Sequence, residues 1–142
     1  EFRRVLFRSC HNPQTHDFAG GREVELDVLL RDICRNPLVS GVTFSGGEPF
    51  CQPEPLYALA VELKKKGKHL MAYSGYTFEQ LMVLENPAVR RLLEQLDLLV
   101  DGPYLEAERN LELRFRGSSN QRVLDVPQSL LANAPVWDER YR

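Results

Sequence analysis

Apolar residues along this chain recur at two alternating spacings, one typical of helices and one typical of short buried strands. The predicted helices are 24–35, 53–66, 77–84 and 86–96. The predicted strands are 41–44, 69–73, 98–100 and 121–126. Thr77 is the predicted N-cap of its helix, with Gln80 completing a capping box. Helices and strands joined by short links predict an α/β fold, a parallel sheet with crossover helices.

Three loops that follow predicted strands carry small and polar residues. They are SGGE at 45–48, SGY at 74–76 and DGP at 101–103. In parallel α/β folds the carboxyl ends of the strands meet at one edge, where ligands bind. We therefore expect all three loops to face a common rim. A double glycine at such a place lets the main chain approach a ligand closely, although a tight turn alone would also explain it.

The composition indicates one soluble domain. The chain has 142 residues, 43% of them hydrophobic and 27% charged, and a formal charge of -2. This charge predicts no nucleic-acid partner, and the absence of a long apolar run predicts no membrane span and a cytoplasmic protein. Three widely spaced cysteines argue against a disulfide framework and favour reduced thiols or metal ligation. Residues 1–9, EFRRVLFRS, differ in character from the rest and are interpreted as a foreign or artefactual segment before a domain at 10–142.

Five motifs together identify a family. They are CHNPQTHDF at 10–18, SGGEPF at 45–50, YSGYTFEQL at 73–81, LLVDGPY at 98–104 and RGSSNQRVLDV at 116–126. With these motifs the chain resembles the radical S-adenosylmethionine superfamily, in its branch of activating proteins for anaerobic ribonucleoside-triphosphate reductase. The resemblance covers residues 10 to about 131 and implies a partial (βα) barrel of the radical S-adenosylmethionine type.

The resemblance also implies a 4Fe-4S cluster held by a C-x-x-x-C-x-x-C loop after the first strand. Cys10 matches the third cysteine of that loop, and Val-Leu-Phe-Arg-Ser stands where the family has the rest. One thiolate cannot hold three irons while the fourth binds S-adenosylmethionine. Cys34 and Cys51 have the wrong spacing to replace the missing ligands and are interpreted as incidental. We therefore expect an N-terminally truncated copy that lacks its first strand and is inactive as it stands. Whether residues 1–9 pair there as a substitute strand, through Val5, Leu6 and Phe7, stays open.

Carried over by position, the resemblance assigns Cys10 to iron and His11 to the neighbourhood of the adenine. It places Gly46, Gly47 and Glu48 around the methionine amino group, with Ser74 as a further contact unless it only caps its loop. Zinc at Cys10 with the nearby histidines is the weaker alternative, since a fourth ligand is missing. Asp101 and the RGSSNQR segment would either shape the mouth for the partner or satisfy strand-end backbone groups, and the structural role is favoured slightly.

In this family the reduced cluster gives one electron to the sulfonium, which releases methionine and a 5'-deoxyadenosyl radical. The radical takes a hydrogen from a glycine Cα of the large reductase subunit, and a flavodoxin-like protein is the expected electron donor. Two alternatives remain open at this point. One is an activase of another glycyl radical enzyme, of the formate-lyase type, and the other is a fragment without a cluster that binds ligand or partner weakly.

Overall fold

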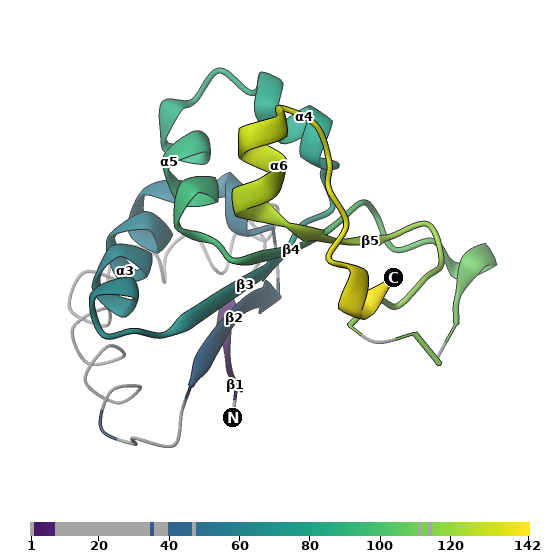
Figure 1. Ribbon diagram of the computed structural model, residues 1–142, viewed down its shortest axis with the longest axis horizontal. Coiled ribbons are helices and arrows are strands. Elements are labelled where there is room, and N and C mark those ends of the chain that lie inside the picture. The colour runs from purple at the N-terminus through teal and green to yellow at the C-terminus, as the bar shows by residue number, and fades with distance from the viewer. Residues whose placement is uncertain (1, 8–34, 36–39, 47, 111, 114) are drawn as a thin grey trace.

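The computed structural model describes residues 2–7, 35, 40–46, 48–110, 112–113 and 115–142. These residues form a sheet of five strands that lie side by side in chain order (Figure 1). The strands are β1 (Phe2–Phe7), β2 (Gly41–Gly46), β3 (His69–Tyr73), β4 (Leu98–Asp101) and β5 (Arg122–Asp125). The first four run parallel, and β5 runs antiparallel to β4.

Four helices cover one face of the sheet (Figure 1). They are α3 (Pro53–Lys65), α4 (Phe78–Val83), α5 (Pro87–Gln95) and α6 (Val126–Ala132). Single 3-10 turns lie at η1 (Pro49–Cys51), η2 (Glu106–Glu108) and η3 (Glu139–Tyr141). The main core lies between the helices and this face, where Val42, Phe44 and Leu99 are fully buried. No described helix is both long and apolar enough to cross a bilayer.

Local sequence signals set the helix boundaries. The Thr77 hydroxyl accepts a hydrogen bond from Gln80 N and the Gln80 side chain accepts one from Thr77 N, so the predicted capping box is confirmed. Asn86 caps α5 by accepting from Ala88 N. Gly67, at φ 75°, takes the left-handed conformation that ends α3.

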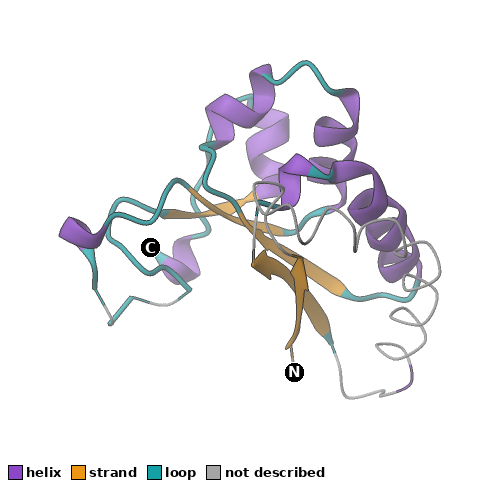
Figure 2. Cartoon of the chain, turned by 180° about the vertical axis from the view of Figure 1, so that it is seen from behind, coloured by secondary structure: helices purple, strands orange, loops and turns teal. Residues whose placement is uncertain are grey.

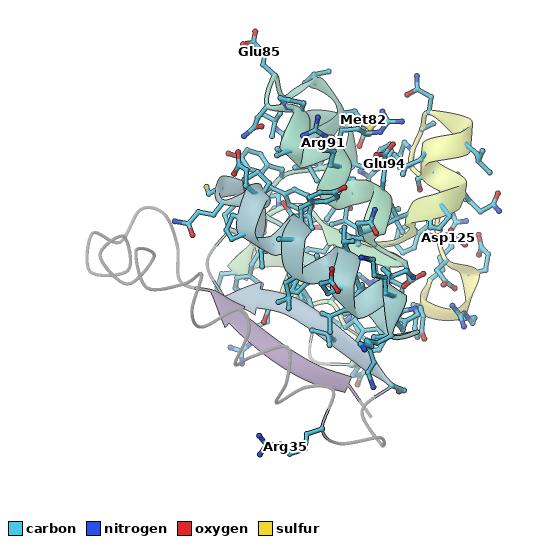
Figure 3. All side chains as sticks on the ribbon, turned by 90° about the vertical axis from the view of Figure 1, so that its left-hand side faces the viewer. Arg35, Met82, Glu85, Arg91, Glu94 and Asp125 are labelled. Atoms are coloured by element: carbon cyan, nitrogen blue, oxygen red, sulfur yellow. The ribbon has the colours of Figure 1, made fainter. Side chains whose placement is uncertain are left out.

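Helix α5 shows why the apolar spacing predicted it. Leu92 and Leu93 are fully buried against the core, whereas Arg91 and Glu94 are exposed (Figure 3). A stripe of apolar residues at helical spacing therefore directs one face of α5 to the sheet and the other to water. The same logic applies to α3, whose buried residues are Pro53, Leu56, Leu59, Ala60 and Leu63.

The opposite face of the sheet carries a second, smaller apolar cluster of Met71, Leu98, Val100 and Val123. Phe115 and Tyr141 pack on it, with their ring centroids 4.9 Å apart. Both residues come from segments beside β5, the loop 102–121 and the C-terminal end, which Figures 1 and 2 show next to each other. We call the two sides the helical face and the open face of the sheet.

The structure confirms the predicted α/β class, the strands at 41–44, 69–73, 98–100 and 121–126, and the helices at 53–66, 77–84 and 86–96. The predicted helix 24–35 lies outside the described residues except for Arg35, which is helical.

The prediction of a purely parallel sheet was wrong. The sheet is mixed, because β5 follows β4 through the loop 102–121, and an antiparallel neighbour needs no crossover helix. The open question about residues 1–9 is answered by β1, which pairs with β2 from Phe2↔Gly41 to Phe7↔Gly46. The segment 1–9 thus supplies an edge strand by main-chain pairing.

Candidate functional site

The candidate site is the rim formed by the carboxyl ends of β2, β3 and β4. Because these strands are parallel, the loops that follow them leave the sheet at the same edge. Glu48, Ser74 and Asp101 stand in these three loops or at their start. The structure thus confirms the common rim that the strand-and-loop pattern predicted.

Glu48 joins two of these loops. Its Oε1 accepts hydrogen bonds from Gly75 N at 2.7 Å and Ser74 Oγ at 3.1 Å. Its Oε2 accepts from Ser74 Oγ at 3.0 Å and from Phe50 N at 3.1 Å. A Cβ added at Gly75 would lie 3.5 Å from Glu48 Oε1, so the loop after β3 approaches the carboxylate closely. One side chain therefore holds the ends of β2 and β3 in a defined relation.

The Glu48 carboxyl is electrostatically unusual. Burial raises the pKa of Glu48 above its ordinary value of 4.5, and the hydrogen bonds from Phe50 N, Gly75 N and the Ser74 hydroxyl oppose this effect only in part. The same hydrogen bonds hold Ser74 and Gly75 against the Glu48 carboxylate.

The third loop is fixed by a buried ion pair. The Asp101 side chain is fully buried, and it accepts from Phe78 N at 2.7 Å and from Arg122 Nε at 3.0 Å. Arg122 also donates to the second Asp101 oxygen and, at 2.6 Å, to exposed Glu79. Asp101 and Glu79 hold the pKa of the Arg122 guanidinium above its usual range. This network ties the end of β4 to the first turn of α4 and to the start of β5.

The RGSSNQR segment completes the rim by satisfying backbone groups. Gln121 Oε1 accepts from Gly117 N at 2.9 Å and Ser118 N at 3.2 Å, and its Nε2 donates to Gly102 O at 3.1 Å. Asn120 Nδ2 donates to Pro103 O at 2.8 Å. Of the two roles left open for this segment, the contacts support the structural one.

A side chain that the sequence analysis did not single out also lies at this rim. Ser45 precedes the double glycine, is 7% exposed, and its hydroxyl has no hydrogen-bond partner in the part of the chain that the structure describes. Its strand neighbours Val42 and Phe44 pack under the helices, so Ser45 points to the open face. The signal that could have found it is the alternation of apolar and hydroxyl residues along GVTFS at 41–45.

The predicted site residues divide into two groups. Glu48 and Ser74 are in contact, and Gly46 ends β2 beside them. Cys10, His11 and Gly47 lie outside the described residues. Within the described residues, no three His, Cys, Asp or Glu side chains lie together in a way that would hold a metal ion. Cys51 is disulfide-bonded, which corrects the expectation of a reduced or metal-binding thiol at this position.

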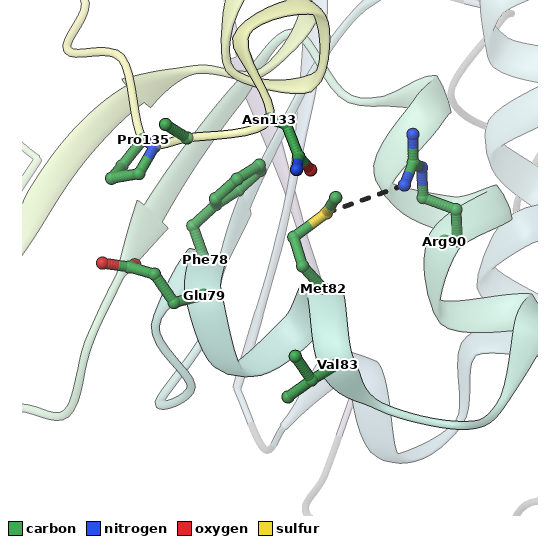
Figure 4. A pocket seen from close by; sticks show the side chains of 8 residues that line it. Phe78, Glu79, Met82, Val83, Arg90, Asn133 and Pro135 are labelled. Atoms are coloured by element: carbon green, nitrogen blue, oxygen red, sulfur yellow. Dashed lines mark hydrogen bonds between the residues drawn. The ribbon is translucent and has the colours of Figure 1, made fainter.

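A cavity of about 500 Å³ lies away from the rim, between α4, α5 and the segment after α6 (Figure 4). Arg90 Nη1 points across it to Met82 Sδ at 3.9 Å, and Asn133 and Pro135 close the other side. None of the three rim loops contributes to its lining. We therefore treat this cavity as separate from the candidate site.

Comparison with known protein families shows the family of this chain. The family described as a 4Fe-4S single cluster domain matches residues 7–124 of the chain. The chain belongs to this family. The match runs from the last residue of β1 through most of β5, so the whole rim described above lies inside it.

Similar curated proteins are activating proteins. The anaerobic ribonucleoside-triphosphate reductase-activating protein of Haemophilus influenzae is 25% identical over 130 residues, which is 82% of this chain and 77% of that protein. The pyruvate formate-lyase 1-activating enzyme of Escherichia coli K12 is 32% identical over 136 residues, 90% of this chain and 52% of that enzyme. The pyruvate formate-lyase-activating enzyme of Clostridium pasteurianum is 43% identical over 65 residues, 42% of this chain and 27% of that enzyme.

These comparisons confirm the resemblance to the radical S-adenosylmethionine activating proteins. The chain spans about three quarters of the Haemophilus protein, about half of the Escherichia enzyme and about a quarter of the Clostridium enzyme. No solved structure matches the chain.

Proposed function

We propose that this chain is the S-adenosylmethionine-binding part of a protein that activates anaerobic ribonucleoside-triphosphate reductase by forming a glycyl radical on it. The observation that carries the proposal is the alignment with the Haemophilus influenzae protein, which extends over most of both chains. The rim supports it, because the loops after β2, β3 and β4 meet where a ligand of a parallel α/β sheet binds. We interpret the sheet as part of a (βα) barrel of the radical S-adenosylmethionine type.

The described rim fits the polar end of S-adenosylmethionine. Ser45 offers a buried hydroxyl without a partner among the described residues, and Gly46 beside it has no side chain to block a ligand. In this proposal Gly46 and Gly47 present main-chain groups to the methionine amino group, and Glu48 holds the loop of Ser74 in place. His11 lies near the adenine in the same proposal.

The cluster, when bound, supplies one electron for the cleavage of the sulfonium. We propose Cys10 as one of its thiolate ligands. The family spacing C-x-x-x-C-x-x-C, counted back from Cys10, falls on Phe7 and Arg3. The described residues therefore do not complete a cluster site, and we propose that these 142 residues alone neither hold a stable cluster nor cleave S-adenosylmethionine.

The partners follow from the same proposal. The large subunit of anaerobic ribonucleotide reductase would present its glycine at the open face, and a flavodoxin-like protein would reduce the cluster. Such a protein would work in the cytoplasm.

A second candidate function is activation of a formate-lyase-type enzyme. It is favoured by the identity of 43% over 65 residues to the Clostridium pasteurianum enzyme and of 32% over 136 residues to the Escherichia coli enzyme. The RGSSNQR segment favours the reductase branch instead. Incubating an active form with each purified glycyl radical enzyme and recording the glycyl radical signal separates the two.

Two preparations test the main proposal. The first is the chain as it is, and in the second residues 1–9 are replaced by a strand and a loop that complete C-x-x-x-C-x-x-C at Cys10. Both are treated anaerobically with iron and sulfide, then with dithionite and S-adenosylmethionine. We expect cluster absorbance and 5'-deoxyadenosine from the second preparation and neither from the first.

A third preparation, with serines at the two restored cysteine positions, controls for the new strand itself and should form neither product. If the completed motif gives no cluster and no cleavage, the assignment of Cys10 and of the reaction is wrong. If the chain as it is forms a cluster and cleaves S-adenosylmethionine, the proposal that it lacks two ligands is wrong.

A further inference from the structure

The Ser45 hydroxyl is an unmatched polar group inside the sheet. It is 7% exposed, and within the described residues its oxygen has no hydrogen-bond partner. Arg116 and Asn120 also have one unmatched side-chain atom, but each donates through another atom, to Gln121 O and Pro103 O respectively. A serine has a single polar side-chain atom, so the whole functional group of Ser45 is unmatched.

Such a group needs an explanation, because burying a hydroxyl without a partner costs free energy that an alanine at the same place would not. Ser45 is not a leftover of local turn chemistry, since it lies within β2 and is paired through its backbone with β1. The main chain at this point is therefore satisfied by the sheet. The group left without a partner is the Ser45 hydroxyl, a hydrogen-bond donor and acceptor that points to the open face.

The open face is polar on one side and apolar on the other. Thr43 and Ser45 lie on it in β2. On β3, β4 and β5 the same face carries Met71, Val100 and Val123, and Tyr73, Phe115 and Tyr141 pack against this cluster. The described aromatic cover thus lies over the apolar half, and the hydroxyl-bearing half stands at the carboxyl end of β2, next to Gly46.

We propose that the Ser45 hydroxyl hydrogen-bonds the charged amino acid end of bound S-adenosylmethionine. The inference rests on the proposed function, which places this end of the ligand over Gly46 and Gly47. Ser45 immediately precedes them and points to the open face. A hydroxyl serves either charged group there, because it donates to a carboxylate and accepts from an ammonium. The adenosine part of the ligand makes no use of Ser45.

The test compares two probes on the 142-residue chain by titration calorimetry. S-adenosylmethionine carries the amino acid end, and 5'-methylthioadenosine lacks it. We expect Ser45→Ala to bind S-adenosylmethionine about tenfold more weakly, as the loss of one hydrogen bond to a charged group predicts. Its affinity for 5'-methylthioadenosine should be unchanged. Thr43→Val, on the same face of β2, is the matched control and should change neither affinity.

Thermal unfolding without ligand supplies an independent measurement. Ser45→Ala should melt at the same temperature as the wild type or higher, because it removes an unmatched group. Ser129→Ala should melt lower, because the Ser129 hydroxyl donates to Asp125 O at 2.7 Å and accepts from Val136 N at 2.9 Å. A clear drop for Ser45→Ala would mean that its hydroxyl has a protein partner, and the inference would be overturned.

The binding outcomes separate this inference from the proposed function. If the wild-type chain and Ser45→Ala bind S-adenosylmethionine with equal affinity, the role of Ser45 is overturned. The proposed function is not affected by that result. An equal loss of affinity for both probes in Ser45→Ala also overturns the role of Ser45, because the hydroxyl would then affect the whole pocket and not the amino acid end alone. The same titrations are repeated on the reconstituted preparation in which C-x-x-x-C-x-x-C is completed at Cys10. If neither this preparation nor the 142-residue chain binds either probe, the proposed function and the inference are overturned together.

Discussion

Replacing Arg122 by methionine should be among the most destabilising single changes at the rim. The Asp101 side chain is fully buried and that of Arg122 is 24% exposed. Arg122→Met keeps most of the side-chain volume but leaves the Asp101 carboxylate buried with only Phe78 N as a described donor. Breaking a buried pair from one side costs about 3–5 kcal/mol. The remaining hydrogen bond places the expected loss near the lower value, about 3 kcal/mol.

Urea unfolding measures this loss directly. The chain has one tryptophan, Trp137, which forms a bridge to Leu124 in β5 and lies under Arg116 at 5.1 Å. Its fluorescence therefore reports on the strand that Arg122 begins, and far-UV circular dichroism reports on the whole. With an m-value of about 2 kcal/mol/M, a loss of about 3 kcal/mol moves the midpoint down by about 1.5 M.

Two controls separate the buried pair from charge in general. Glu62→Gln breaks the exposed ion pair with Lys65 at 3.2 Å and should cost less than about 0.5 kcal/mol. The double change Asp101→Leu with Arg122→Met removes both buried charges and should recover most of the stability. A loss below about 1 kcal/mol for Arg122→Met alone, or no recovery in the double variant, would refute the argument.

Three further predictions concern the other parts of the rim. Because burial raises the pKa of Glu48, its carboxyl stays protonated to a higher pH in the folded chain than in the unfolded chain. The free energy of unfolding, compared with that of Glu48→Gln, should therefore fall as the pH rises above 4.5, and urea unfolding across that range measures it. Gly102→Ala should cost about 1 kcal/mol in the same assay, because φ is 98° while the nearest atoms leave room for a Cβ at 3.9 Å; an unchanged midpoint would contradict this. Gln121→Ala should expose the loop 102–121 to trypsin at Arg109 before global unfolding, and equal cleavage rates in wild type and variant would show that Gln121 does not hold the loop.

For the candidate site, the sequence predicted which loops lie at the common edge of the sheet, but not the contacts between them. Parallel strands followed by SGGE, SGY and DGP were enough to place Glu48, Ser74 and Asp101 at one edge. Their actual partners were not predictable, because Glu48 and Gly75 are 27 residues apart and Phe78 and Asp101 are 23 apart. Such contacts depend on how the loops turn after leaving the sheet, which no local spacing specifies.

The sequence alone determined the features that depend on near neighbours in the chain. The capping box of Thr77 and Gln80 joins residues three positions apart, and the apolar stripe of α5 repeats every turn, so both are written in local order. The motifs also placed the chain in its family without any coordinates, because each preserves the residues that one loop needs.

Only the tertiary structure decided the direction of β5, the pairing of β1 and the position of Ser45. Strand pairing uses main-chain groups that every residue carries, so Phe2–Phe7 can join β2 whatever its origin, and β5 can run antiparallel once the loop 102–121 brings it back. Alternation along β2 assigns Phe44 and Ser45 to opposite faces, but which face the helices cover is settled by packing. That packing leaves the Ser45 hydroxyl buried, with no hydrogen-bond partner among the residues that the structure describes.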